Sequence, residues 1–558
     1  MLWILLAVLL MIWASVSRLK NRKLYALAKQ SSSKSISLPI VGHAYKFLGT
    51  DEDRMVTFEE LGKEAYEHED GVLCHWQGNL FYVIVADPVT ADVLLKACLE
   101  KVDLMRMFRV LLGNGSIFAP VSIWRPRRKI LAPTFSQKNL NSFVQVFSRQ
   151  SRVMADQVGN VAGKGAFSMW KYFTSYTMDS VFETTLGIKV NSQLEPERPF
   201  LCAFENCCQI DAKRICQPWF YNDTVNKIFN KKAFLSYAQS KELIWKFMNK
   251  IIEIKWEDLK KKKLAPDSDQ EHKQSWKTFL ELLIESPGGY GNVELREETL
   301  VIVLAGTDTS AVGAAFTTVM LAKYPDVQEK VYEELQEIFG DSDRPVTHED
   351  LPRLKYLDAV IRETLRLYPP VPVITRKVEN DVKLPSGMTL SDGCNVVINI
   401  WSIHRNPKYW GDDAELFRPE RFIDTPLAHP AAFMPFSYGP RSCLGYQYAM
   451  MSMKSVLATL LRRYRFISSE AKNGSIGSKN GLIGAKNGSI GAKNGSSETK
   501  NGSIGAKNGS TETKNGSIGA KNGSSEANDD PNKPKLRVKF DIMLKHVNDF
   551  EIQLELRT

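Results

Sequence analysis

One cysteine stands in an unusual setting near the end of the chain. The segment PFSYGPRSCLGYQYAM, Pro435 to Met450, places Cys443 between Gly439 and Gly445, two residues after Arg441 and at the start of an amphipathic helix. A buried structural cysteine does not need glycines on both sides, and a disulfide cysteine needs a partner. The pattern therefore indicates a thiolate that ligates a large, flat group. A plain core thiol is the alternative interpretation.

A long apolar segment carries a second group of residues suited to chemistry. The stretch from Glu297 to Pro325 is almost uncharged through its middle, which predicts a helix buried on all sides. Gly306 leaves space for a bulky ligand, and Thr309 can open the helix hydrogen bonds and hold a water. Asp308 is costly in an apolar interior unless it has a role or a partner. The three residues predict a gap, an acid and a hydroxyl beside a cofactor; a glycine–threonine kink in a core helix is the alternative.

Charged residues in two further segments predict supporting roles. Glu363 and Arg366 lie three residues apart on one helix face, and the apolar residues and prolines around them favour an interior pair. Arg421, in a proline-containing segment, can join this pair through bidentate contacts. Trp124 and Arg128 lie four residues apart on a basic helix, one face of which either reaches an anionic group or faces solvent.

Together these segments resemble a cytochrome P450, and the resemblance covers nearly the whole chain outside residues 472–526. Each motif is weak alone, but the five occur in the family's order and at its spacing. They are F-x-x-G-x-R-x-C-x-G, A/G-G-x-D/E-T, E-x-x-R, PERF and W-x-x-x-R. The matching residues are Phe436, Gly439, Arg441, Cys443 and Gly445; Ala305, Gly306, Asp308 and Thr309; Glu363 and Arg366; Pro419 to Phe422; and Trp124 and Arg128.

The resemblance implies a heme b whose iron is bound through the thiolate of Cys443, a ligand that favours O–O cleavage. Asp308 and Thr309 would then deliver protons to dioxygen. The loop residues Phe436, Gly439 and Gly445 would lie against the heme. Its propionates would bind Arg441, Trp124, Arg128 and Arg376. Glu363, Arg366 and Arg421 are expected to be structural rather than catalytic.

Finer features resemble insect members of the family-4 clan, chiefly the segments HPAAFMPFSYGPRSCLG and WRPRRKILAPTFSQKNLNSF. Many members of that clan have a glutamate before the helix glycine that is esterified to the heme. Ala305 stands there in this chain, so no heme ester is expected. Substrate contacts are expected from the loop of residues 104–118, from a Pro-Pro turn and from residues 547–550 at the tip of the last hairpin. The candidates, mostly apolar and suited to a lipophilic molecule, are Phe118, Ala305, Val373, Ile374 and Phe550.

The chain that must position these residues is long enough for one large domain. It has 558 residues, 43% of them hydrophobic, and a net charge of +10. Residues 472–526 contain eight Lys and three Glu, so they carry 8 − 3 = +5 of that charge. The mildly basic remainder fits an acidic protein partner or a membrane surface and argues against nucleic acid. The expected fold class is mainly α with a smaller β region, a cytochrome P450 fold with an N-terminal membrane anchor.

The eight cysteines do not form a recognisable metal or disulfide pattern. No CxxC pair occurs, and the cluster Cys202, Cys207, Cys208 and Cys216 has no nearby histidine. This spacing argues against zinc and favours reduced thiols in a domain that faces the cytosol.

Residues 1–20 are predicted to form an uncleaved membrane anchor. The stretch from Leu2 to Val16 is uncharged, no basic residue precedes it, and Arg18, Lys20, Arg22 and Lys23 follow it. This charge asymmetry leaves residues 21–558, the heme domain, in the cytosol. A cleaved signal peptide is the alternative, because the stretch is shorter than the ~20 residues of an ordinary span. The expected location is the endoplasmic reticulum membrane.

Residues 472–526 form a low-complexity insert in which KNG returns every seven residues. Each unit has too few apolar residues for a coiled coil, so a flexible loop is predicted. Seven of the eight copies read N-G-S, which is a glycosylation acceptor only in a secretory lumen. After Pro531, KLRVKFDIML and EIQLELR are predicted to pair as two strands of a hairpin.

The resemblance implies a monooxygenase that inserts one oxygen atom from O2 into a lipophilic small molecule such as a fatty acid, odorant, hormone or xenobiotic. The chain has no flavin or dinucleotide motif, so NADPH-cytochrome P450 reductase is the expected electron donor, and cytochrome b5 is a second candidate partner. Candidate docking residues are Arg125, Arg127, Arg128, Lys129 and Lys454. Alternatives are a thiolate-heme isomerase or dehydratase, which often lacks the acid–alcohol pair, and a heme-binding carrier without turnover.

Overall fold

The computed structural model describes residues 16, 19–195, 199–264, 277–286, 289–469 and 535–557. Most of the predicted anchor, residues 1–20, and the whole repeat, residues 472–526, lie outside these described residues. Residues 535–557 belong to the same compact unit as the residues up to Ser469. The chain after the repeat therefore rejoins the domain that precedes it.

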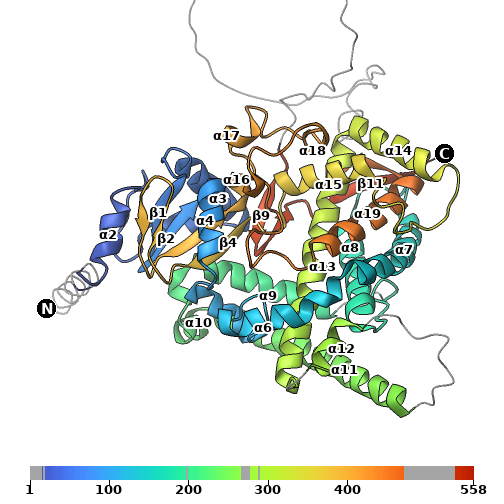
Figure 1. Cartoon of the computed structure of the whole chain (residues 1–558), viewed down its shortest axis with the longest axis horizontal. Helices are drawn as coiled ribbons and strands as arrows, with labels where there is room; N and C mark the ends of the chain where they lie inside the picture. Colours follow the sequence, from blue (N-terminus) through green and yellow to red (C-terminus); the bar gives the residue numbers. More distant parts are fainter. Residues whose placement is uncertain are drawn as a thin grey trace, which may run out of the picture. The chain divides into compact units, whose positions relative to one another are not determined.

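Helices make up most of this unit, and its long central helix is α13 (Asn292–Lys323) (Figure 1). The other helices of ten residues or more are α3 (Asp51–Ala65), α4 (Pro88–Ala97), α6 (Val121–Leu131), α7 (Gln137–Gly159), α8 (Trp170–Val181), α9 (Pro199–Cys216), α11 (Lys231–Leu264), α14 (Pro325–Phe339), α15 (Lys355–Leu367) and α19 (Tyr446–Arg463). Shorter helices are α2 (Arg22–Ala28), α5 (Arg109–Leu112), α10 (Asp223–Phe229), α12 (Phe279–Ile284), α16 (Ile400–Ile403), α17 (Pro407–Trp410) and α18 (Arg421–Asp424).

Helix α13 is the core helix that the apolar segment predicted. It packs against α8, α11, α15 and α19. In the part of the chain that the structure describes, it is the one helix long and apolar enough to cross a membrane, but 78% of its apolar window is buried in the protein. Four residues of its central turns are only partly buried, and they share one face: Ile302, Ala305, Gly306 and Thr309.

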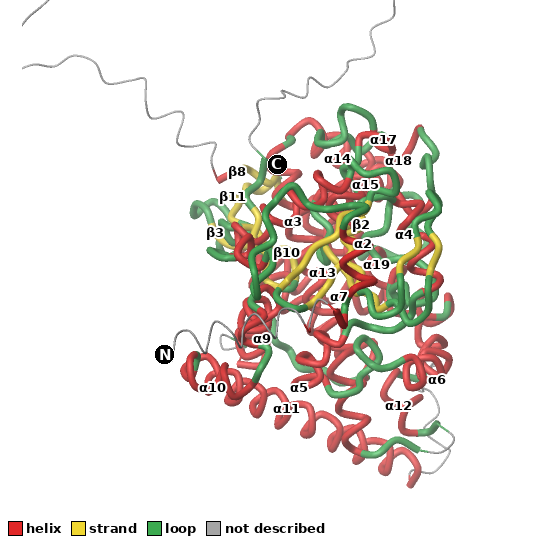
Figure 2. Tube along the Cα trace, turned by 90° about the vertical axis from the view of Figure 1, so that its left-hand side faces the viewer, coloured by secondary structure: helices red, strands yellow, loops and turns green. Residues whose placement is uncertain are grey.

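The main sheet has four strands in the order β1-β2-β7-β4, namely β1 (Val72–Gln77), β2 (Leu80–Val85), β7 (Asn395–Asn399) and β4 (Val373–Lys377). Strands β2 and β7 are parallel, and the other two pairs are antiparallel. A second sheet combines β3 (Phe167–Ser168), β11 (Glu551–Leu556) and β8 (Tyr464–Ser468), which lie together in Figure 2. The pair β5 (Val382–Lys383) and β6 (Thr389–Leu390) completes the minor β structure with β9 (Val538–Asp541) and β10 (Met543–His546).

The C-terminal strands pair differently from the sequence prediction. Strand β9 and the first half of β10 lie in the first predicted strand, and the two form a hairpin with each other around Ile542, whose φ is 60°. Strand β11 instead pairs antiparallel with β8 along five residues and with β3. The predicted hairpin between the two C-terminal segments is therefore wrong, because the chain reverses inside the first one.

Candidate active site

A cavity of about 500 Å³ lies between α13, α9, the segment of residues 104–118 and the Cys443 loop. Residues from segments far apart in the sequence meet in its wall, including most of those that the motifs singled out. The predicted site residues that line it are Phe118, Trp124, Arg128, Ala305, Thr309, Val373, Ile374, Phe436, Arg441, Cys443 and Gly445.

The Cys443 loop is held from both sides so that the thiol borders this cavity. The Cys443 amide donates to the carbonyl of Phe436 at 2.8 Å, and Arg128 Nη1 donates to the carbonyl of Ser442 at 2.8 Å. The side chain is accessible to the cavity. Enclosure by the protein raises the pKa of the thiol, while the amide of Gly445 and the charge of Arg128 act in the opposite direction.

The two glycines of this loop, Gly439 and Gly445, have different structural roles. Gly439 has a φ of 72°, and a Cβ there would lie 2.9 Å from the carbonyl oxygen of Leu95. A Cβ on Gly445 would meet no protein atom closer than 3.7 Å. The protein itself therefore requires glycine at Gly439, whereas the space beside Gly445 suits a flat group lying on the loop.

Three basic side chains, Lys101, Arg376 and Arg441, lie near one another at one edge of the cavity; Lys101 and Arg441 line it and Arg376 does not. Burial lowers the pKa of both Arg376 and Arg441 to about 10. The charge of Arg441 lowers the pKa of Arg376 further, and the charges of Arg109 and Arg128 lower the pKa of Arg441 against the opposing effect of Glu100. Burial and these two arginines lower the pKa of Lys101 well below its usual range. The Nε atoms of Arg376 and Arg441 have no hydrogen-bond partner among the described residues.

This cluster fits a bound dianion such as a pair of heme propionates. Glu100 lies near Arg441, but its carboxylate also accepts from the Val121 amide at 2.6 Å. The Arg441 guanidinium lies 4.5 Å from the Trp124 ring, which fixes its direction. Arg128 is partly committed to the Ser442 carbonyl. Sequence reasoning missed Lys101, since a lysine before an apolar loop carries no motif.

Asp308 and Thr309, adjacent in helix α13, lie in different surroundings. Thr309 lines the cavity and donates from Oγ1 to the carbonyl of Ala305 at 2.6 Å. Asp308 is buried and is not among the lining residues; its Oδ1 lies 3.1 Å from Nζ of Lys545 in β10. A turn of about 100° per residue places adjacent side chains on different faces.

Gly306 serves helix packing as well as the cavity. A Cβ at this position would lie 2.8 Å from Cγ2 of Val181 in α8. The space predicted for a ligand is thus partly taken by the neighbouring helix, although Gly306 still contributes to the cavity wall.

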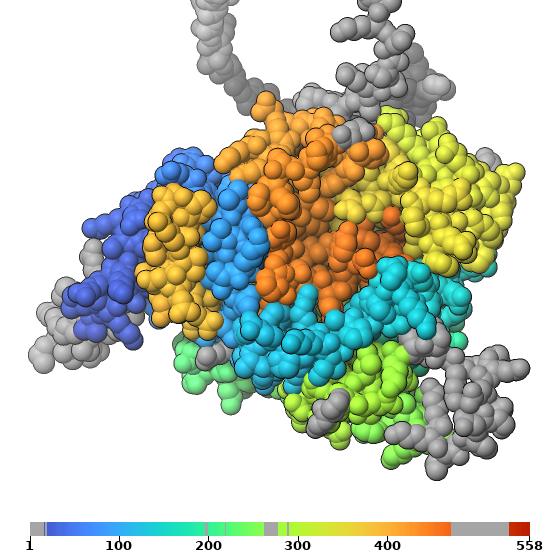
Figure 3. Space-filling view, in the orientation of Figure 1, coloured from blue at the N-terminus to red at the C-terminus, as the bar shows by residue number. Residues whose placement is uncertain are grey.

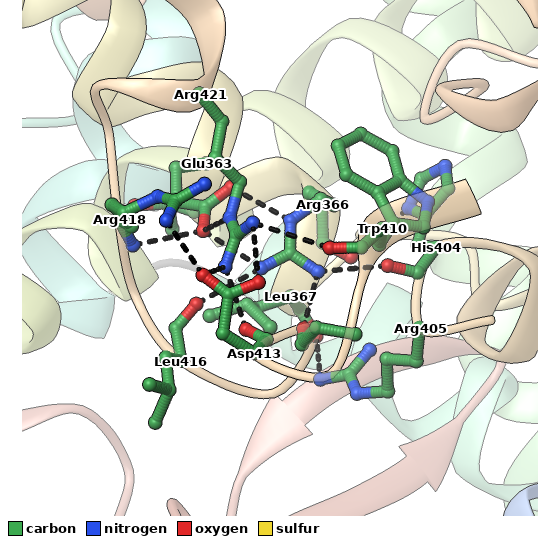
Figure 4. A network of polar contacts seen from close by, with 12 residues as sticks. Glu363, Arg366, Leu367, His404, Arg405, Trp410, Asp413, Leu416, Arg418 and Arg421 are labelled. Atoms are coloured by element: carbon green, nitrogen blue, oxygen red, sulfur yellow. Dashed lines mark hydrogen bonds and ion pairs between the residues drawn. The ribbon is translucent and has the colours of Figure 1, made fainter. Parts of the chain in front are cut away.

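The predicted Glu363–Arg366 pair is the centre of a buried network behind the loop (Figure 4). Both side chains are fully buried, and Arg366 donates to the two oxygens of Glu363 at 2.7 Å each. Arg421 Nε lies 3.3 Å from Glu363 Oε1, and the Arg418 amide donates to the same oxygen at 2.9 Å. Arg366 also donates to the carbonyls of His404, Ala414 and Leu416. The network ties together the irregular chain that leads to Cys443.

One of the predicted substrate contacts fails in this structure. Phe550 does not line the cavity: it is 1% exposed and packs against Trp170 and Phe316, because the chain reverses at Ile542 instead. Ile542 and Met543 occupy the cavity wall.

The predicted docking group is also smaller than expected. Arg127 is buried against Glu298 and Glu294, Arg128 borders the cavity, and Lys454 pairs with Asp358 at 2.8 Å. Arg125 and Lys129 remain exposed.

Comparison with known proteins accounts for this combination of fold and cavity. The family model of cytochrome P450 matches residues 33–489. The chain belongs to the cytochrome P450 family. Cytochrome P450 4V2 of Mus musculus is 31% identical over 461 residues, which cover 80% of this chain and 86% of that protein. Cytochrome P450 4c21 of Blattella germanica is 31% identical over 440 residues (77% and 86%), and cytochrome P450 4d2 of Drosophila melanogaster is 30% identical over 442 residues (77% and 87%).

The predicted cytochrome P450 fold, enzyme class and cofactor are thereby confirmed, whereas the N-terminal membrane anchor stays a prediction. The P450 is mainly helical with a small β region, and it resembles family-4 members that include insect proteins. It is a heme-thiolate monooxygenase whose cofactor is heme b. In the described residues no group of His, Cys, Asp and Glu forms another metal site, and all eight cysteines are free.

Proposed function

We propose that this P450 inserts one oxygen atom from O2 into a lipophilic small molecule, with Cys443 as the iron ligand. The observation that carries the proposal is the arrangement of one cavity: Cys443 and Thr309 both border it, and the cluster of Lys101, Arg376 and Arg441 lies at its edge. The remaining wall is mostly apolar, which suits a lipophilic substrate.

Each residue then has a defined task. Arg376, Arg441 and Lys101 would bind the propionates, and Trp124 and Arg128 hold Arg441 and the Cys443 loop in place. Heme b supplies the activation of dioxygen when it is bound. Thr309 holds a water or hydroxyl proton at the cavity, beside the Ala305 carbonyl that it bonds. Asp308 can pass a proton toward Thr309 only after its carboxylate leaves Lys545.

The electron donor in this proposal is NADPH-cytochrome P450 reductase, with cytochrome b5 as a second candidate. The exposed Arg125 and Lys129 of α6 support a basic docking face. Helix α6 and the segment that leads into α19 adjoin one another on the face seen in Figure 3, and Arg128 bonds across them. Residues 1–20 would anchor the heme domain, residues 21–558 with their insert at 472–526, to the endoplasmic reticulum with the domain in the cytosol.

The test begins with the carbon monoxide difference spectrum of the reduced protein. A strongly red-shifted Soret band that disappears in Cys443→Ala supports the ligand assignment, and a variant that keeps the band refutes it. Turnover with purified reductase then separates the alternatives. A monooxygenase consumes NADPH in step with product, an isomerase forms product without NADPH, and a carrier forms none.

A further inference from the structure

Helix α9 (Pro199–Cys216) presents one face to the cavity. That face consists of Phe204, Cys207, Cys208, Asp211, Ile215 and Cys216, at the three- and four-residue spacing of one helix side. Five of the six side chains are apolar or thiols, and Asp211 is the exception. A carboxyl group in such a wall is unfavourable unless it is paired or has a ligand.

Asp211 is almost fully buried, but only one of its two carboxylate oxygens accepts a hydrogen bond. The side chain is 1% exposed, and its Oδ2 accepts a hydrogen bond from the Tyr237 hydroxyl of α11 at 3.1 Å. Its Oδ1 has no hydrogen-bond partner among the described residues. Arg214 Nη1 lies 3.8 Å from Oδ1, but Arg214 donates its short hydrogen bond to Asp223, at 2.8 Å.

Glu298, the other acid in the cavity wall, is a carboxylate with a structural role and serves as a comparison. Glu298 Oε1 accepts from Arg127 at 2.7 Å, and Oε2 accepts from Ser116 at 2.8 Å. Both of its oxygens are therefore satisfied by the protein. Asp211 differs because its Oδ1 accepts no hydrogen bond and has only the 3.8 Å ion pair with Arg214.

The basic residues of the wall do not offer a counterion for a substrate acid. The lining cations in the described chain are Lys101, Arg128 and Arg441, and all three belong to the cluster or loop contacts at the propionate edge. Away from that edge, Asp211 is the charged group with an unmet hydrogen bond. When ionised, Asp211 would repel a substrate carboxylate, whereas it would accept a hydrogen bond from a hydroxyl or ammonium group.

We infer that Asp211 is a specificity-determining residue, which selects a lipophilic substrate whose polar end donates a hydrogen bond. The inference rests on the proposed function, because it takes the cavity as the substrate pocket. A protonated amine binds most tightly through a charge-assisted hydrogen bond, an alcohol binds next, and a free fatty acid binds most weakly. Among the substrates expected from the sequence, unesterified fatty acids are thereby disfavoured.

The test compares three ligands with the same chain, dodecylamine, dodecanol and dodecanoate, on the full-length heme-loaded protein. Dissociation constants come from isothermal titration calorimetry at about pH 8, above the raised pKa of Asp211, so that its carboxylate is ionised. Calorimetry does not depend on the heme spectrum, and absorption spectra are recorded in parallel. The variant is Asp211→Asn, which keeps the shape and the Tyr237 contact. The matched control is Asp223→Asn, which removes the same charge from the same arginine at a position whose side chain is 70% exposed.

The wild-type protein should bind dodecylamine at least about tenfold more tightly than dodecanoate, the size expected for one charge-assisted hydrogen bond. Asp211→Asn should remove most of that preference, and Asp223→Asn should keep it. Three results overturn the inference: dodecanoate binding as tightly as the amine, an unchanged preference in Asp211→Asn, or an amine spectrum showing nitrogen bound to iron.

If Asp211→Asn does not fold, the order of the three dissociation constants of the wild-type protein tests the inference by itself. The carbon monoxide spectrum of the ligand-free sample separates the two proposals. A missing thiolate band contradicts the assignment of Cys443 whatever the ligand ranking, and a normal band with the wrong ranking contradicts only the role of Asp211.

Discussion

Asp211→Asn is expected to stabilise the P450 at neutral pH while it weakens ligand selection. Burial raises the pKa of Asp211 from 3.8 to about 7, against the opposing effects of Arg214 and Tyr237. Because the folded protein binds this proton more tightly than the unfolded chain does, the contribution of Asp211 to stability falls as the pH rises from about 4 to about 7. Above about pH 7 the carboxylate is ionised in the folded protein, and the whole free-energy cost of burying its charge opposes folding.

The size of the penalty follows from the two pKa values. They differ by about 3, and each unit is worth about 1.4 kcal/mol, so ionised Asp211 costs about 4 kcal/mol. The same relation leaves about 2 kcal/mol of this cost at about pH 5. Asparagine does not titrate, so the free energy of unfolding of Asp211→Asn minus that of the wild type should grow by about 2 kcal/mol from about pH 5 to about pH 8.

The assay is urea unfolding of the wild type, Asp211→Asn and Asp223→Asn at a series of pH values, followed by far-UV circular dichroism. The difference between proteins at each pH isolates the titration of the changed side chain. Asp223→Asn should run parallel to the wild type. A difference that is flat with pH, or an Asp211→Asn variant that loses stability as the pH rises, would refute both the raised pKa and the reading of Asp211 as a group kept for a ligand at the expense of stability.

Three further outcomes test the rest of the site. Thr309→Ala should keep heme and NADPH consumption but lower product formed per NADPH several-fold; an unchanged yield, measured by product and NADPH assays together, contradicts the proton-holding role. Glu363→Gln leaves Arg366 without its buried partner and should cost about 3–5 kcal/mol of stability and much of the bound heme. As a control, Glu415→Gln, at a partly exposed position, should cost about 0–1 kcal/mol. Equal heme content and equal urea midpoints for the two variants would count against the network. Heme should leave the protein in acidified organic solvent, because Ala305 offers no carboxyl group for an ester, and retention of covalent heme on the chain by mass spectrometry would contradict this.

The motifs predicted most of the residues that meet in the candidate site, because their chemistry is local. Cys443 with its glycines lies in one loop, and Glu363 and Arg366 lie in one helix, so short spacing is enough to recognise them. Arg376 and Arg441 were also found by position. Their role as a cluster of unpaired cations, together with Lys101, became visible once three separate segments met at the cavity edge.

Residues whose role depends on distant partners were predicted poorly. Asp308 and Thr309 are neighbours in the sequence, yet they face different surroundings because α13 lies between the cavity and β10. Arg127 was read as a docking residue, but Glu298 of α13 draws it inside.

A linear sequence carries periodicity, turn residues and motif spacing, so it was sufficient to establish the helical class, the buried central helix and the thiolate ligand of this P450. It does not carry strand register or the face that a residue turns toward a distant element. The reversal at Ile542 puts Ile542 and Met543 in the cavity wall, whereas Phe550, in the turn between β10 and β11, packs against Trp170 and Phe316 in the core. The half-satisfied carboxylate of Asp211 is likewise a product of packing, since it exists only where α9, α11 and the cavity meet.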